Sequence, residues 1–297
     1  MNLLILGGAS FDSIVYLDEF PEPTPQTIHE SVFVETVGST GTGKAANCCY
    51  LGFDTTLQVV LGNDMYGQRI KDFLGSKPIR AIYDIDPNGT ERHVNIMDKL
   101  GRRISIFVNP TSNEPPIRYA DMEPEIKKAD VVVLNIVNYC RNYIPFLKKH
   151  GCEVWTDLHD YDGVSSYHHD FIEASNYIFM SSDNLPDYRK TMAEIMDKGK
   201  QLVVCTHGKA GATLLTPEGK WLDTPSVSRY QLVDANGAGD AFFSGFLYGY
   251  KHEYELSDCL LLGHILGGLC ISSPHIAADG LSVARVEKEF ASLRTKK

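Results

Sequence analysis

The sequence predicts an α/β protein with a mainly parallel sheet, helices on both of its faces, and a small additional β lid. Short runs rich in β-branched residues recur along the chain. Their hydrophobicity is nearly continuous rather than alternating, which is typical of strands that are buried on both faces. Segments of helical length separate several of these runs, and alternating strands and helices favour a parallel, doubly wound sheet.

The strands expected in the large sheet are the apolar runs Leu3–Leu6, Val131–Val137, Glu153–Leu158, Tyr177–Met180, Leu202–Cys205 and Ala212–Leu215. Helices are expected between some of them, at Ile144–His150 and Asp187–Lys198. From Asp240 onward no strong strand pattern is present, so the last part of the chain is expected to be helical.

Two stretches depart from this alternation and predict the lid. Residues 13–37 contain a proline cluster, and residues 80–108 contain a hairpin-like turn at Lys99–Arg102 before a partly alternating run. We therefore expect a catalytic α/β core of residues 1–12, 38–79 and 109–297, with a lid of residues 13–37 and 80–108. The alternative is a pair of ordinary edge hairpins.

Composition excludes some classes of protein. The chain has 297 residues and a formal net charge of −10, which disfavours a protein that binds nucleic acid through a basic surface. No apolar run approaches the length of about 20 residues that a membrane helix requires. The seven cysteines include no Cys-x-x-Cys pair, so reduced thiols in the cytoplasm are expected rather than zinc or disulfides.

The segment Val233–Gly245 carries the chemistry. Its small residues Gly237, Ala238 and Gly239 lead directly into an apolar helix that starts near Asp240. A helix start exposes backbone N–H groups and the positive end of the dipole, and small residues let an anion approach them. A carboxylate beside such a site suits phosphoryl transfer to an alcohol, because it can take the hydroxyl proton. Taken alone, Asp240 could equally be a helix cap after a glycine turn.

The rest of the chain favours the catalytic interpretation. The segment Asp234–Phe242 resembles the C-terminal signature of the ribokinase (PfkB) carbohydrate kinase family, Asp-Thr-x-Gly-Ala-Gly-Asp-x-Phe, with Ala235 in place of threonine. Four further segments resemble family motifs, in the family's order and across most of the chain: Gly7–Asp12 with Phe20-Pro21, Thr42–Asn47, Gly62–Gly67 and Thr206–Gly211.

The resemblance implies a ribokinase-like fold and a kinase that uses ATP and Mg²⁺. It implies that Asp240 is the catalytic base and that the amides of Gly237, Ala238 and Gly239 form the anion hole. The sugar site would be lined by Asp12, Gly43, Lys44 and Asn47. The nucleotide would lie along Thr206, Gly208 and Gly211. Asp234, with nearby carbonyl groups, would hold a monovalent cation, as in some members of the family.

One family element is missing. The family usually carries Asn-x-x-Glu at the end of a central strand, where it helps to organise Mg²⁺ and phosphates. The equivalent stretch here is Ser181–Leu185, which has no glutamate. Either Asp183 substitutes for it, or the metal is held mainly through ATP and water, as Mg²⁺ often is.

Two other nucleotide-binding motifs are matched only in part. Gly38–Lys44 nearly fits a P-loop, but Ala45 follows where the motif needs a hydroxyl group for Mg²⁺. Gly41–Ala46 faintly resembles a dinucleotide fingerprint, but it lies far from the first strand and no acidic residue is placed convincingly after a second strand.

The sequence thus predicts a kinase for a hydroxyl group of a small sugar or sugar-like substrate, enclosed between core and lid. A nucleoside kinase of the same fold is the alternative, and a catalytically weak sugar or nucleotide sensor is a third interpretation. Candidates for setting specificity are Asn135, Asn138, Asp157 and His159. Neither nucleic acid nor membrane is expected as a partner, and a homodimer through the lid is expected by analogy with several family members.

Overall fold

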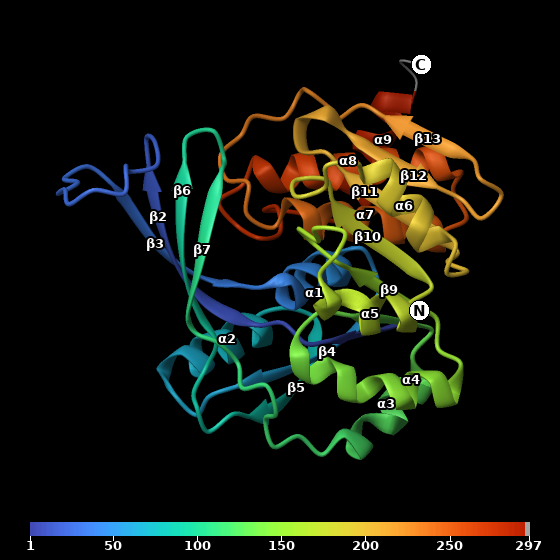
Figure 1. Cartoon of the computed structure of the whole chain (residues 1–297), viewed down its shortest axis with the longest axis horizontal. Helices are drawn as coiled ribbons and strands as arrows, with labels where there is room; N and C mark the ends of the chain where they lie inside the picture. Colours follow the sequence, from blue (N-terminus) through green and yellow to red (C-terminus); the bar gives the residue numbers. More distant parts are fainter. Residues whose placement is uncertain (295–297) are drawn as a thin grey trace.

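The computed structural model describes residues 1–294 and contains two separate β-sheets. The larger sheet has nine strands and forms the centre of the core, whereas the smaller has four and lies to one side of it (Figure 1). The fold class predicted from the sequence is confirmed.

The large sheet has the strand order β13-β12-β11-β10-β9-β8-β1-β4-β5. Neighbouring strands are parallel except at β12, which is antiparallel to both β11 and β13. All six strands expected in this sheet are present. The bounds are β1 (Asn2–Leu6), β4 (Asp54–Leu61), β5 (Ile79–Ile85), β8 (Val131–Leu134), β9 (Val154–Asp157), β10 (Tyr177–Ser181), β11 (Leu202–Thr206), β12 (Ala212–Leu215) and β13 (Trp221–Thr224).

Helices cover both faces of this sheet, because successive strand residues point to opposite sides. In β1, Leu3 and Ile5 belong to one core cluster and Leu4 and Leu6 to the other. The first cluster packs under α1 (Thr40–Tyr50), α2 (Met65–Gly75), α7 (Ala238–Lys251), α8 (Leu256–Ile271) and α9 (Val283–Arg294). The second packs under α3 (Glu123–Lys128), α4 (Ile144–His150), α5 (His169–Ala174) and α6 (Tyr188–Met196).

The small sheet has the order β3-β2-β6-β7, and its hairpin ends project away from the core in Figure 1. Its strands are β2 (Ser10–Leu17), β3 (Val32–Gly38), β6 (Arg92–Asp98) and β7 (Arg103–Asn109). The hairpin turn expected at Lys99–Arg102 joins β6 to β7. The alternative of two ordinary edge hairpins is wrong, because the four strands pair with one another in a sheet of their own.

The boundary between the sheets differs from the predicted one. Strand β5 begins the stretch 80–108 that the sequence assigned to the lid, yet it pairs in parallel with β4 at the edge of the large sheet. The reason is its alternating apolar residues: Ile79, Ala81 and Tyr83 pack against the core cluster that lies under α1 and α2. Asp12, in contrast, already lies within lid strand β2.

Two properties of the described chain bear on its surroundings. Within residues 1–294, no helix combines the length and the apolar character needed to cross a bilayer. All seven cysteines lie in this part of the chain and are free thiols. Six of them are buried, and burial raises the pKa of Cys48 and of Cys259 to about 12, so these thiols stay protonated at neutral pH.

Candidate active site

Helix α7 begins as the sequence predicts, at the glycine turn before Asp240. Gly237 is the N-cap residue with a φ of +77°, and the helix runs from Ala238. A side chain at position 237 would be strained at this φ and would also lie 3.2 Å from backbone atoms of Ile276. At Gly239, nothing in the described chain lies within 4 Å of the point that a Cβ atom would occupy, so the space beside this amide is open.

Asp240 lies in the first turn of α7 and faces the first turn of α1. Its Oδ1 accepts a hydrogen bond of 2.7 Å from Thr40 Oγ1 and one of 2.6 Å from Lys44 Nζ. Only 14% of the Asp240 side chain is exposed. No hydrogen bond to Oδ2 is present in the part of the chain that the structure describes, so this oxygen is the one available to a substrate hydroxyl.

Lys44 connects Asp240 to a second carboxylate. Its Nζ, fully buried, also lies 3.2 Å from Asp157 Oδ2 at the end of β9. Burial alone would lower the pKa of Lys44, but the charges of Asp240 and Asp157 outweigh it and leave the pKa raised. Burial would likewise raise the pKa of Asp157, yet His159, Lys44 and a hydrogen bond from the His159 amide bring it down to about 2. The Lys44 ammonium group is therefore stabilised between the side chains of Asp157 and Asp240.

Glycines allow α1 to approach this cluster closely. A Cβ at Gly43 would lie 2.5 Å from Asp240 Oδ2, and a Cβ at Gly41 would lie 1.9 Å from the Gly7 carbonyl oxygen. The glycines of this segment thus let α1 pack on Asp240 and on the end of β1. Because Lys44 points into the protein and pairs with carboxylates, the segment does not have the form of a P-loop, in agreement with the missing hydroxyl at Ala45.

Asp12 lies on lid strand β2 and is only 3% exposed. It accepts hydrogen bonds from Ser10 Oγ at 2.6 Å and from Asn95 Nδ2 at 3.2 Å. His93 Nδ1 lies 3.4 Å away, and Gly38 leaves room for the carboxylate on the neighbouring strand β3. Burial raises the pKa of Asp12, and the nearby His93 and the Ser10 hydroxyl group offset this only in part.

Asn47 is oriented toward backbone rather than toward open space. Its Nδ2 donates to the carbonyl oxygens of Gly43 at 2.8 Å and of Ile276 at 2.9 Å. Ile276 is the residue that packs against Gly237. The amide of Asn47 therefore ties α1 to the loop that supports the start of α7, which is a positioning role within the predicted sugar site.

The predicted nucleotide residues lie at the carboxyl end of β11. Thr206 is its last residue, and a 3₁₀ turn (Gly208–Ala210) follows. Gly208 has a φ of +53° and is exposed, whereas Gly211 has a φ of +112° and leaves no room for a side chain against the Thr224 carbonyl group. Ligands of open α/β sheets bind outside the carboxyl ends of the strands, which is the edge where this turn lies.

Asp234 has other partners than the expected cation. Its Oδ2 accepts a hydrogen bond of 2.7 Å from Tyr16 OH, and its Oδ1 accepts one of 2.8 Å from the Asn236 amide. No cluster of three or more His, Cys, Asp or Glu side chains suited to a metal occurs within residues 1–294. Because both carboxylate oxygens are already bonded, the residues present fit a monovalent cation poorly.

Mg²⁺ fits better. Asp183 is exposed just beyond β10, at the same sheet edge as Thr206, and offers a carboxylate oxygen. Mg²⁺ in kinase sites is typically bound by one or two carboxylates together with phosphates and water. The oxygen donors present are therefore of the right kind, although the usual glutamate is missing.

The specificity candidates divide into two groups. Asp157 belongs to the cluster with Lys44, and His159 follows it with its amide bonded to the Asp157 carboxylate at 3.0 Å. Asn135 is fully buried and donates to the carbonyl oxygens of Leu6 and Gly7. Asn138 donates to the Asn113 carbonyl group and so lies in a loop contact.

Sequence reasoning missed one residue of this site, Thr40. Thr40 precedes Lys44 by one helical turn and donates to the same oxygen of Asp240. The i, i+4 spacing of a hydroxyl and an ammonium group at the start of a glycine-rich helix is a signal that could have identified it.

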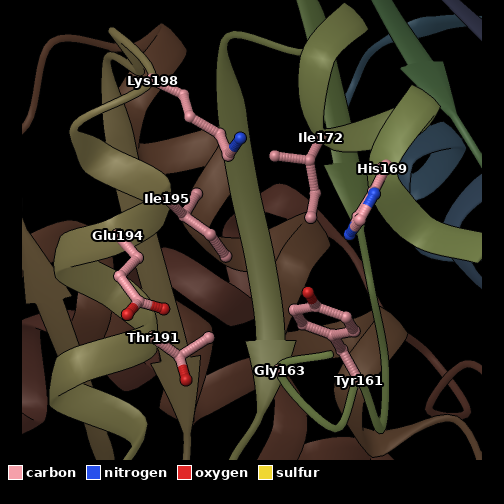
Figure 2. A pocket seen from close by; sticks show the side chains of 8 residues that line it. All are labelled: Tyr161, Gly163, His169, Ile172, Thr191, Glu194, Ile195 and Lys198. Atoms are coloured by element: carbon pink, nitrogen blue, oxygen red, sulfur yellow. The ribbon is translucent and has the colours of Figure 1, made fainter. Parts of the chain in front are cut away.

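A separate hollow of about 150 Å³ lies between α5 and α6 (Figure 2). Figure 2 shows Tyr161 and His169 on one side of it, and Thr191 and Glu194 of α6 with Lys198 just beyond that helix on the other. None of the predicted site residues lines this hollow, so we assign it no part in the reaction.

Comparison with known proteins extends over nearly the whole chain. A family model described as "pfkB family carbohydrate kinase" matches residues 168–281. An acarbose 7(IV)-phosphotransferase from Actinoplanes sp. is 31% identical over 300 residues, with 98% of each chain covered. A nucleoside kinase from Methanocaldococcus jannaschii is 24% identical over 290 residues, covering 88% of this chain and 87% of its own.

Solved structures agree on the fold. The microbiome-derived acarbose kinase Mak1 has a TM-score of 0.87 and 28% identity, with 98% of this chain and 99% of that chain covered. Ribokinase from Giardia lamblia has a TM-score of 0.86 at 14% identity, with the same coverage of 98% and 99%. The second likeness concerns the fold alone, and together they confirm the ribokinase-like architecture.

Proposed function

Because the chain belongs to the PfkB family of carbohydrate kinases and is an ATP-dependent phosphotransferase, we propose that it phosphorylates a hydroxyl group of a sugar or sugar-like substrate with Asp240 as the base. The observation that carries this proposal is the position of Asp240 in the first turn of α7, next to a glycine turn and held by Thr40 and Lys44 of α1.

The chemistry follows from the two oxygens of Asp240. Oδ1 is held by Thr40 and Lys44, so the carboxylate cannot rotate freely, and Oδ2 takes the proton of the substrate hydroxyl. The hydroxyl oxygen then attacks the γ-phosphorus of ATP while the bond to ADP breaks. The amides of Gly237 and Gly239 can donate to the migrating phosphoryl group from the start of α7. The Ala238 amide, the third predicted donor, is hydrogen-bonded to the Ala235 carbonyl oxygen at 3.3 Å and would have to leave it to join them.

Binding of the two substrates is divided along the site. On the acceptor side, Asp12 would accept hydrogen bonds from substrate hydroxyl groups and Gly43 leaves room beside Asp240. Lys44 and Asn47, both buried, hold Asp240 and the start of α7 in place rather than bind the substrate directly. Thr206, Gly208 and Gly211 form the ATP side. Asp183 with water would hold Mg²⁺, which would offset the negative charge of the phosphates. The small sheet acts as a lid that excludes water from the reaction.

The names of two relatives support a proposal for the acceptor class. Two of the proteins to which the chain is similar over nearly its whole length carry the names of acarbose kinases. We therefore place acarbose-like oligosaccharides first among the candidates and monosaccharides second. The name of the archaeal relative supports nucleosides as the alternative acceptors.

A coupled assay of ADP release tests the proposal. The purified chain is given ATP and Mg²⁺ with acarbose, with maltose-type sugars, with ribose and fructose, and with nucleosides. We expect ADP release that requires a carbohydrate acceptor and yields a phosphorylated product by mass spectrometry. Turnover with nucleosides alone would favour the alternative. Tight ligand binding without ADP release for any acceptor would favour a sensor and contradict the proposal.

We also propose a homodimer formed through the outer face of the lid. Strand pairing aligns Phe33, Val15, Ile96 and Ile104 in one row across all four strands, on the face opposite Asp12. Phe33 is 60% exposed and Ile104 is 44% exposed. An exposed apolar sheet face of this extent typically marks an interaction surface.

The mass of the chain in solution tests the dimer. We expect light scattering to give twice the mass of one chain, and we expect Ile104→Lys to give a single chain with an unchanged melting temperature. A wild-type protein that stays monomeric at high concentration would contradict this proposal and leave the proposed reaction untouched.

The free thiols support a cytoplasmic location. The cysteines are unpaired and mostly buried, a state that suits a reducing compartment.

A further inference from the structure

Two residues of the lid reach across to the segment that precedes the glycine turn. Tyr16 of β2 donates its hydroxyl group to Asp234 Oδ2 at 2.7 Å, and Arg103 of β7 donates to Asn236 Oδ1 at 3.2 Å. The turn of the β6–β7 hairpin also comes close, since a Cβ at Gly101 would lie 3.4 Å from the Ala235 side chain. The lid thus makes two hydrogen bonds to residues 234–236 and lies beside Ala235.

This segment leads directly into the proposed anion hole. Asn236 is followed by Gly237, whose left-handed conformation opens the first turn of α7. Asp234 is 7% exposed, and its second oxygen binds the Asn236 amide, which closes a short loop just before the turn. The direction of the amides at Gly237–Gly239 therefore depends on how residues 234–236 are held.

The same lid residues are also connected to the acceptor side. Asp12 and Tyr16 lie on the same face of β2, because residues at even spacing along a strand point to the same side. Arg103 is close enough that its charge favours the ionised form of Asp12, partly offsetting the effect of burial on the Asp12 pKa. A substrate that binds at Asp12 therefore contacts the same small sheet whose residues Tyr16 and Arg103 hold the segment before the glycine turn.

The bond between Tyr16 and Asp234 has the properties of a stable contact. Burial and the adjacent carboxylate both raise the pKa of Tyr16, so the phenol stays protonated and can only donate to Asp234. The Asp234 carboxylate is occupied by this bond and by the Asn236 amide. A monovalent cation would have to compete with both contacts, which is why the residues present fit it poorly.

We propose that Tyr16 and Arg103 are positioning residues that latch the closed lid to residues 234–236 and so align the anion hole, with Asp234 serving this latch in place of a monovalent cation site. The inference rests on the proposed function of the amides at Gly237–Gly239. Closure of the lid over an acceptor would then also align the amides of the anion hole at Gly237–Gly239.

Steady-state kinetics of Tyr16→Phe test the latch. The variant keeps the ring and loses only the hydroxyl group bonded to Asp234. Because hydrogen bonds to charged groups contribute about 1.5–3 kcal/mol, we expect kcat to fall by roughly 10- to 100-fold. We expect the KM for the acceptor to change much less, because Asp12 is untouched. An unchanged kcat would overturn the proposal.

A matched control separates the latch from a general loss of stability. Tyr248 also donates its hydroxyl group to a carboxylate, Glu287, at 2.8 Å, but it does so between α7 and α9. We expect Tyr248→Phe to keep the wild-type kcat, and an equal loss of kcat in both variants would contradict a specific latch. Arg103 is exposed, so Arg103→Gln provides a second variant that should fold.

Two further readouts bear on the latch alone. Because both lid contacts hold one segment, the losses in Tyr16→Phe and Arg103→Gln should be non-additive in the double variant. Wild-type kcat should be equal in potassium, sodium and choline chloride at equal ionic strength, and strong activation by potassium would overturn the role given to Asp234.

If Asp240→Asn abolishes turnover while Tyr16→Phe does not alter it, only the latch fails. If neither variant alters turnover, the proposed function fails.

Discussion

The proposed acceptor side and the proposed ATP side of the site are built in opposite ways. On the acceptor side, Lys44 is fully buried between two carboxylates and Asp240 is held by two donors from α1. On the ATP side, the turn Gly208–Ala210 is exposed and presents mainly backbone. Side chains locked by packing orient the reacting groups, whereas a ligand bound by backbone groups tolerates looser surroundings.

The difference teaches where substitutions should act. A change on the acceptor side disturbs charged groups that are largely shielded from water, and such groups are costly to leave unpaired. A change on the ATP side alters a loop whose neighbours are solvent. We therefore expect large effects on stability and kcat from the first region and small effects on ATP affinity from the second.

The largest effect on stability is expected for Lys44→Met. The substitution leaves Asp157 and Asp240 close together without the ammonium group between them. Breaking a buried ion pair typically costs about 3–5 kcal/mol, and urea unfolding should show a loss of that size. Lys128, which pairs with Glu125 at the surface, is the control: Lys128→Met should cost about 1 kcal/mol or less. Equal losses in the two variants would remove the contrast between buried and exposed pairs.

A large effect on turnover is expected for Gly43→Ala. The added methyl group would lie 2.5 Å from Asp240 Oδ2, so the carboxylate must move. A shift of about 1 Å in a catalytic group can cost roughly 100-fold in rate, and we expect a loss of kcat of that order. Gly75→Ala, at the end of α2 where nothing in the described chain lies within 4 Å of the new methyl group, should keep kcat. A Gly43→Ala enzyme with normal kcat would show that Asp240 is not confined by α1.

A smaller effect is expected for Gly208→Ala on the ATP side. The position has a φ of +53° with open space around it, so alanine costs about 1 kcal/mol of backbone strain and meets no neighbour. We expect the KM for ATP to rise by less than about 10-fold, in line with that cost. A loss of turnover as large as that of Gly43→Ala would erase the distinction between the two sides.

A pH dependence of stability, without a direct effect on turnover, is expected near the ATP side. His264 of α8 is buried next to Thr224, and burial lowers its pKa to about 4. Below pH 6.5 the unfolded chain binds a proton at this histidine that the folded chain does not, so stability falls as the pH drops from 6.5 toward 4. At pH 5 the histidine should account for a loss of roughly 2 kcal/mol relative to pH 7. Urea unfolding of His264→Gln should lack this part of the loss, and an identical pH profile would contradict the assignment.

Local sequence patterns predicted much of the fold but few of the contacts between the side chains of the site. The apolar runs of β8 and β11 and the helix start before Asp240 follow from neighbours in the sequence. Strand β4 (Asp54–Leu61) begins with polar residues, and β5 resembles lid sequence until its partner is known. Their assignment depends on pairing across the sheet.

The residues that contact one another in the site are even further apart in the sequence. The pair Tyr16–Asp234 spans 218 positions, and Lys44–Asp157 spans 113. Each residue by itself resembles an ordinary surface tyrosine or turn aspartate. Only the folded chain shows that Asp157 pairs with the same lysine as Asp240, and that Asp234 binds Tyr16 of the lid.

The central claim is that Asp240 accepts the proton of the substrate hydroxyl, and the most direct measurement compares turnover and ATP binding in Asp240→Asn. The substitution keeps the size and one oxygen acceptor of the side chain but removes the base. General bases contribute about 10²–10⁴ in rate, so we expect kcat to fall within that range while the Kd for ATP stays within about threefold of wild type. A kcat within threefold of wild type would contradict the account.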